Sequence, residues 1–160
     1  MPSQDNLINW SGDLSHPITP RMVKRLGDTL DKAEHACSAT QSNGLCDRLF
    51  VAEQHYRGAL YDRNFVAKVK AERAKRVPKQ ADAFKLRDAM CSARARREQF
   101  EKLWPDFVTT RELIDARVAD DLTEHLYYVA EAKFQDAQRE VRADKRAGIR
   151  RYPASRIYRH

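Results

Sequence analysis

Apolar residues recur at intervals of three and four along most of this chain, which is the period of one face of an α-helix. The first stripe follows Thr19-Pro20, a pair typical of a helix N-cap and first helical position. It consists of Val23, Leu26, Leu30, Ala33 and Cys37. The polar segment 38–44 interrupts it, and the Asn-Gly pair that ends this segment predicts a helix stop followed by a loop.

A second stripe predicts a helix from about residue 45 to residue 76, before Pro78. Its members are Cys46, Leu49, Phe50, Tyr56, Leu60 and Val66. Because the loop between the two stripes is short, we expect the first two helices to form an antiparallel hairpin. The side chains expected to pack together are those of Leu26, Leu30, Leu49, Tyr56 and Leu60.

Two further helices are expected beyond Pro78. One spans about 80–103 and stops at Trp104-Pro105. The other begins at Thr109, which with Glu112 three residues later makes a capping box, and its pattern ends near Gly148. At 1.5 Å per residue this helix would be about 57 Å long, which exceeds the width of a compact domain of this length, so its end should project.

The predicted fold class is all-α, with three to four helices, an N-terminal helical hairpin and a long projecting last helix. Residues 1–19 are expected to form an extended N-terminal arm, 20–148 a helical domain, and 149–160 a basic, aromatic C-terminal arm. Charged residues make up 33% of the chain, with only 5 Gly and 6 Pro, which favours long helices with narrow apolar stripes. The longest apolar run, 126–130, is far shorter than the roughly 20 residues that span a bilayer, and the N-terminus lacks the pattern of a secretory signal or a transit peptide.

Charge is distributed in blocks of alternating sign. Residues 68–102 carry 12 basic and 5 acidic side chains, and 139–160 carry 8 and 2, whereas 103–138 carry 3 and 8. Such blocks favour surfaces for different partners. The candidate basic surface comprises Lys68, Lys70, Arg73, Lys75, Arg76, Lys79, Arg94, Arg96 and Arg97. It could face an acidic protein, anionic lipid headgroups, a nucleic-acid backbone or only solvent.

No pattern predicts a cofactor, a metal ion or a catalytic centre. The five glycines are at least fourteen residues apart, so the chain lacks a glycine-rich phosphate loop. The cluster Asp120, Asp121 and Glu124 beside His125 is expected to be a solvated acidic face. A zinc site from residues 35, 37, 46 and 55 is disfavoured, because residues nine apart on a helix point to opposite sides.

Cys37 and Cys46 bracket the predicted hairpin loop, and they could be bridged or could remain reduced within the apolar stripe. A helical hairpin with paired cysteines, here about residues 25–65, resembles the small accessory subunits of the mitochondrial intermembrane space. The chain departs from that pattern, since eight residues separate the cysteines where nine are typical, and Cys91 supplies no second pair. The resemblance implies an oxidising compartment and a disulfide.

The C-terminal arm interleaves arginines with aromatics around Pro153. Arg and Tyr are enriched at interface anchors, so this arm is a predicted partner-binding segment. Its candidate residues are Arg150, Arg151, Tyr152, Arg156, Tyr158 and Arg159. Together these features predict a non-catalytic structural or accessory subunit of a large multi-protein assembly, with a mitochondrial membrane complex such as a respiratory-chain complex or ATP synthase favoured over a virion. The alternative is a basic helical nucleic-acid-binding protein.

Overall fold

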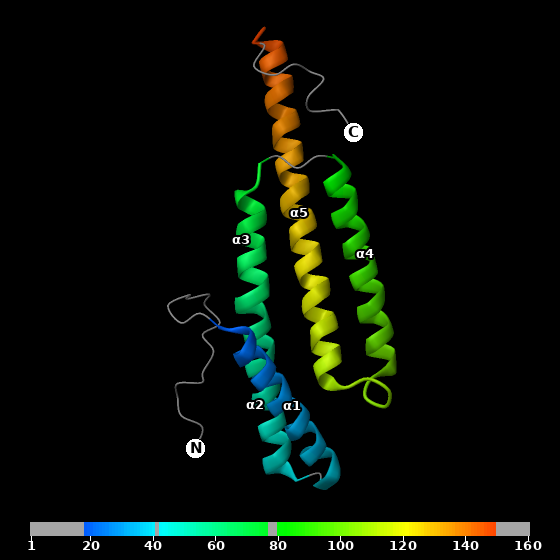
Figure 1. Ribbon diagram of the computed structural model, residues 1–160. Coiled ribbons are helices and arrows are strands. Elements are labelled where there is room, and N and C mark those ends of the chain that lie inside the picture. Colours follow the sequence, from blue (N-terminus) through cyan, green and yellow to red (C-terminus); the bar gives the residue numbers. More distant parts are fainter. Residues whose placement is uncertain (1–17, 41, 77–79, 150–160) are drawn as a thin grey trace.

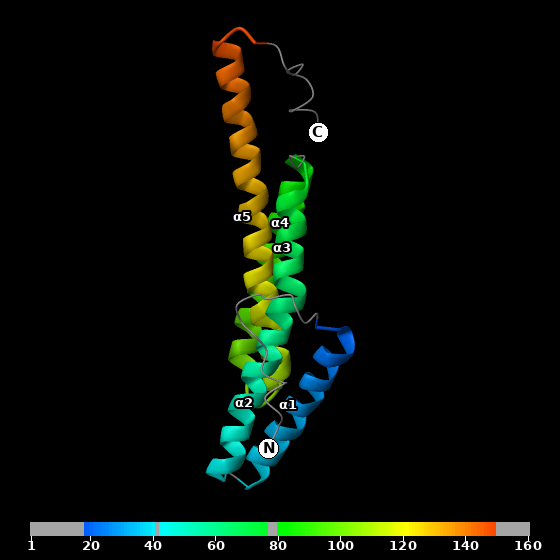
Figure 2. The same cartoon turned by 90° about the vertical axis from the view of Figure 1, so that its left-hand side faces the viewer.

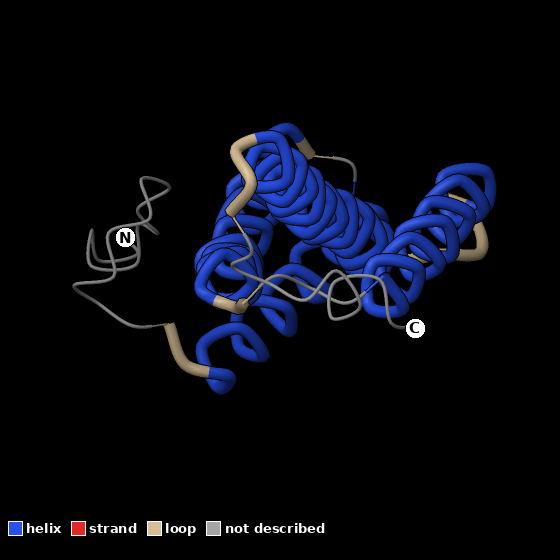
Figure 3. Tube along the Cα trace, turned by 90° about the horizontal axis from the view of Figure 1, so that it is seen from above, coloured by secondary structure: helices blue, strands red, loops and turns tan. Residues whose placement is uncertain are grey.

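The computed structural model describes residues 18–40, 42–76 and 80–149, and this part of the chain contains helices and short connections but no strand (Figure 3). α1 (Pro20–Thr40) is followed by α2 (Asn43–Leu60), a π-helical turn (Tyr61–Phe65) and α3 (Val66–Ala74). The last three of these elements form one continuous helical rod, and α1 is separate from it. α4 (Gln80–Leu103) and α5 (Thr110–Arg146) complete the described fold. The predicted all-α class is therefore confirmed, including the N-terminal hairpin and the long last helix (Figure 1).

The hairpin is tighter than the sequence pattern indicates. Thr19 caps α1 as predicted, because its hydroxyl accepts a hydrogen bond from the backbone N–H of Met22 at 3.3 Å. The predicted loop 38–44 is wrong at both ends, since α1 continues to Thr40 and α2 already begins at Asn43. Ser42 explains the difference: its Oγ accepts from the N–H of Leu45 at 3.3 Å, so the Asn-Gly pair starts a helix and does not end one.

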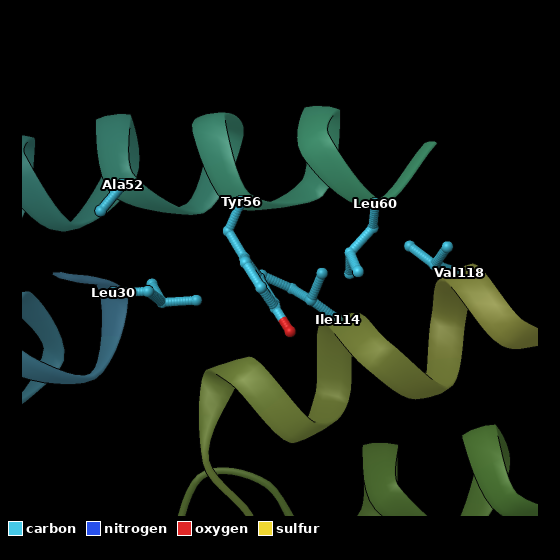
Figure 4. Close-up of a cluster of buried hydrophobic side chains, with 6 residues drawn as sticks. All are labelled: Leu30, Ala52, Tyr56, Leu60, Ile114 and Val118. Carbon is cyan, nitrogen blue, oxygen red and sulfur yellow. The ribbon is translucent and has the colours of Figure 1, made fainter. Parts of the chain in front are cut away.

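The hydrophobic core lies where the hairpin meets the start of α5. Figure 4 shows the side chains from α1, α2 and α5 converging in one cluster. The buried members are Leu30, Ala52, Tyr56, Leu60, Ile114 and Val118, and Leu26 and Leu49 pack against them. The five side chains expected to close the hairpin are thus in one cluster, and α5 covers it.

The single helix expected over 45–76 is interrupted by the π-helical turn Tyr61–Phe65. A π turn inserts an extra residue into the helical register and so changes which side chains face a neighbour. Here both ends of the turn contact α5: the Tyr61 hydroxyl donates to Asp121, and the centres of the Phe65 and His125 rings are 4.7 Å apart.

α5 contacts each of the other described α-helices. Its predicted capping box is present, with Thr109 Oγ1 accepting from the Glu112 N–H at 3.2 Å and the Glu112 carboxylate accepting from the Thr109 N–H at 3.0 Å. Near the end of α3, Lys133 donates to the backbone carbonyls of Glu72 and Lys75. Beyond this point α5 continues past the ends of α3 and α4 in both views (Figures 1 and 2), as the sequence predicts. None of the described helices is long and apolar enough to cross a membrane.

Candidate functional site

Polar contacts between α1 and the start of α5 frame a groove at the end of the molecule opposite the projecting helix. The Glu34 carboxylate accepts from the Thr110 backbone N–H at 3.1 Å and from its hydroxyl at 2.6 Å. A carboxylate at a helix N-terminus satisfies a free N–H group and interacts favourably with the helix dipole. Glu34 therefore fixes the first turn of α5 against α1.

Arg111 adds a second link between the same elements. Its Nη1 donates to Asp31 at 2.9 Å and to Asp28 at 3.3 Å, and its guanidinium lies 5.6 Å from the centre of the Tyr56 ring. The guanidinium also covers Gly27, where an added Cβ would lie only 2.5 Å from Arg111 Cζ. Gly27 is thus the residue that allows the arginine to approach α1 so closely.

Tyr56 connects the hydrophobic core to this polar cluster. Its hydroxyl donates to Asp115 Oδ1 at 2.5 Å, while its ring is buried in the core. Burial and the hydrogen bond to Asp115 raise the pKa of Tyr56 to about 12. Desolvation likewise raises the pKa of Asp115 and, together with nearby Glu34, that of Glu53. The cluster therefore concentrates negative charge in partly desolvated surroundings.

The groove itself has a volume of about 740 Å³ and lies between α1, the loop after α4 and the first turns of α5. Its acidic lining residues are Asp31, Glu34, Asp106, Glu112 and Asp115. The lining cation is Arg111, and Phe107 stands at the edge with 83% of its surface exposed. Such a groove suits a ligand that is both cationic and apolar. Within the described ranges, no group of three or more His, Cys, Asp or Glu side chains could hold a metal ion.

The structure places the two candidate disulfide cysteines together at the tip of the hairpin. Cys37 and Cys46 are joined by a disulfide, and their Cα atoms are 5.2 Å apart, inside the range that an unstrained bridge requires. The bond holds the C-terminal end of α1 to the first turn of α2. Cys91, on α4, is free and exposed.

The residues of the candidate basic surface are divided between α3, the segment that follows it, and α4. Lys68, Lys70 and Arg73 are exposed on α3, and the adjoining Lys75 pairs with Glu72 at 2.7 Å. Arg76 is exposed just after α3, whereas Lys79 lies outside the described residues. The three arginines predicted with them are on α4, a separate rod beside α5 (Figure 1).

Those three arginines contact other parts of the chain. Arg97 Nη1 lies 2.7 Å from Asp120 Oδ2, and Arg94 lies 3.4 Å from Glu124. The Arg96 guanidinium lies 5.0 Å from the centre of the Phe100 ring. Asp120 is 1% exposed, so the expectation of a solvated acidic face is wrong for this residue: α4 covers it and supplies its counter-charge.

Sequence reasoning missed the groove and its supporting contacts. Gly27 was the available signal, because a glycine inside a helical stripe costs about 1 kcal/mol and often marks a close approach. The contact of Glu34 with Thr110 has no local signal, since 76 residues separate the partners. The six candidate partner-binding residues of the C-terminal arm lie outside the described residues.

Comparison with known protein families, with curated proteins and with solved structures finds no match to this chain.

Proposed function

We propose that this protein is a non-catalytic structural subunit that braces neighbouring chains in a large assembly. The observation that carries the proposal is the set of large apolar side chains that remain exposed on α1, α2, α4 and α5 and in the loops beside them. Eight large ones in the described ranges are at least 41% exposed, namely Met22, Phe50, Val51, Phe84, Trp104, Phe107, Tyr128 and Ile149. Single exposed apolar residues are normal on any protein surface, so the grouped ones support the proposal: Phe50 and Val51 are neighbours on α2, and Trp104 and Phe107 are in the short loop after α4. Grouped apolar side chains are typical of surfaces that partners cover.

α4 supports the same proposal. This helix has 24 residues, yet none of those whose side chains are described is fully buried. It packs along α5 with one narrow face, so the rest of its surface is available to a partner. Helices in proteins gain most of their stability from tertiary packing, and α4 buries little of its surface within this chain, which favours further packing against a partner.

The disulfide at the hairpin tip supports a location where thiols are oxidised. A hairpin of two helices joined in this way suits the intermembrane-space side of a mitochondrial membrane complex, such as a respiratory-chain complex or ATP synthase. A virus particle is the second location that we consider, since disulfide-bonded proteins also occur on virion surfaces.

The alternative function is binding of nucleic acid or another anionic surface through α3. Lys68, Lys70 and Arg73 make no ion pair within the described part of the chain and remain available to phosphates or lipid headgroups. The arginines of α4 add little to this surface, because two of them neutralise α5 carboxylates. We therefore rank this function second.

The test is to tag the full chain in the cells that produce it and to analyse gently solubilised extracts by native electrophoresis. A structural subunit should migrate with a particle far larger than the 18.6 kDa chain, and nuclease treatment should not change this. Phe84→Asp, which places a charge on the exposed face of α4, should reduce incorporation, whereas Lys68→Ser should not. Migration as a free chain would contradict the proposal, and release by nuclease would favour the alternative.

A further inference from the structure

The groove between α1 and the start of α5 contains carboxylate groups that can accept more hydrogen bonds than the fold uses. Asp106 makes no hydrogen bond or ion pair in the described residues, and Glu112 uses one oxygen to cap α5. The other three acidic side chains of the groove hold α5 or Tyr56 in place. A carboxylate has about four acceptor positions, so even these partly used groups can bind a further cation.

The loop that closes the groove adds an apolar contact. Phe107 is 83% exposed, the largest exposure among the large apolar side chains of the described residues, and Pro105 and Val108 line the groove beside it. An arginine that binds a carboxylate can also stack its planar guanidinium on an aromatic ring. The groove therefore suits a peptide segment in which arginines alternate with apolar or aromatic residues.

The chain contains one segment with this composition. Residues 150–160 include four arginines, two tyrosines and one isoleucine but no acidic residue. Their charge and aromatic content complement the groove, in which five carboxylates outnumber one arginine. The first turns of α5 line the groove, whereas residues 150–160 follow the C-terminal end of α5 in the sequence.

Covalent geometry prevents this segment from filling the groove of its own chain. From Glu112 to Arg146, α5 rises about 51 Å at 1.5 Å per residue. The eleven residues after Ile149 span at most about 36–40 Å when fully extended. Ile149 folds back on the end of α5, where its N–H donates to the Asp144 carbonyl at 2.8 Å, so the arginines and tyrosines beyond it fall short of the groove.

We propose that the groove binds residues 150–160 of a second copy of this chain. The proposal rests on the structural role proposed above and names one of its contacts. Because the groove and the C-terminal segment are different surfaces, the contact is heterologous, and two copies joined by one such contact leave one groove and one segment free. Successive copies would form a row or a ring, within which the remaining exposed apolar faces could bind other subunits.

Two full-length variants test the proposal without disturbing the fold. The groove variant carries Asp106→Lys and Phe107→Ser, two exposed positions in the loop after α4. The tail variant carries Arg156→Ser, Tyr158→Ser and Arg159→Ser. The matched control carries the same chemical changes on α4, as Asp88→Lys and Phe84→Ser, both exposed and both outside the groove lining.

Sedimentation velocity over a range of concentrations gives the readout. The unaltered chain and the control should associate beyond the dimer, whereas each of the other two variants should associate at least tenfold more weakly and remain near 18.6 kDa. An equimolar mixture of the groove and tail variants should form a dimer and nothing larger, because one intact groove meets one intact tail. A contact that involves neither the groove nor the tail does not predict that the two variants complement each other.

Three outcomes would overturn the inference: a monomeric unaltered chain, a groove variant that associates as the control does, or a mixture that stays monomeric. None of them bears on the structural role itself, because incorporation into the larger particle is measured separately in extracts. Conversely, head-to-tail association of a chain that enters no particle would contradict only the proposed function.

Discussion

Replacing Arg97 with methionine should destabilise the protein more than replacing its partner, Asp120. The Arg97 side chain is 33% exposed, whereas the Asp120 side chain is 1% exposed, and their closest approach is 2.7 Å. Removing one partner of a buried ion pair costs about 3–5 kcal/mol, because the remaining charge stays desolvated. Arg94, 3.8 Å from Asp120, compensates in part, so we expect about 3 kcal/mol for Arg97→Met.

The reverse change should cost less. In Asp120→Asn the amide oxygen can still accept from Arg97, which reaches solvent over a third of its surface, so about 1–2 kcal/mol is expected. The ion pair also leaves Arg97 Nε and Asp120 Oδ1 without hydrogen bonds. Replacing both residues, as Arg97→Met with Asp120→Leu, should therefore come within about 1 kcal/mol of the unaltered protein.

Urea unfolding followed by circular dichroism at 222 nm measures these differences. Arg139→Met is the control, since Arg139 and Asp136 form an exposed pair at 3.5 Å and its loss should cost less than about 0.5 kcal/mol. An Asp120→Asn variant that is as unstable as Arg97→Met, or a double variant that is less stable than Arg97→Met alone, would contradict these expectations.

Three further outcomes are expected. Gly27→Ala should gain less stability in urea unfolding than Gly44→Ala, because its methyl group would displace the end of the Arg111 side chain and weaken its contacts with α1, whereas Gly44 has nothing within 4 Å and its replacement should stabilise by up to about 1 kcal/mol. Cys37→Ser should lose the roughly 2.6 kcal/mol that a nine-residue closure contributes and should abolish any effect of reductant on Tm, whereas Cys91→Ser should change neither. Because the folded state raises the pKa of Tyr56 to about 12, it binds more protons than the unfolded chain above pH 10, so stability should fall between pH 10 and 12. Tyr56→Phe should show a smaller fall over the same range, and an unchanged fall would contradict the assignment.

The helices and their first pairing follow from local features of the sequence. The Thr19-Pro20 start and the capping box of Thr109 with Glu112 act within one turn, so they can be recognised without any knowledge of the fold. The apolar stripes identify which face of each helix is buried, and the short loop makes the first two helices neighbours.

Other local features were interpreted wrongly because the same residues are compatible with more than one local structure. The Asn-Gly pair at 43–44 could end one helix or start another, and the cap from Ser42 decides between the two. The π-helical turn at 61–65 has no sequence pattern of its own; it brings Tyr61 to Asp121, a residue 60 positions away.

The partners of the charged residues depend on the tertiary fold. Asp120 and Arg97 each belong to a run of like charges that suggests a solvent-exposed face, yet they neutralise each other between α4 and α5. Likewise, the groove combines carboxylates of α1 with those that follow α4, and no spacing along the chain relates them. Periodicity fixes the face of a helix on which a residue lies, whereas the partner opposite that face depends on how distant helices pack, and that packing is set by the whole chain.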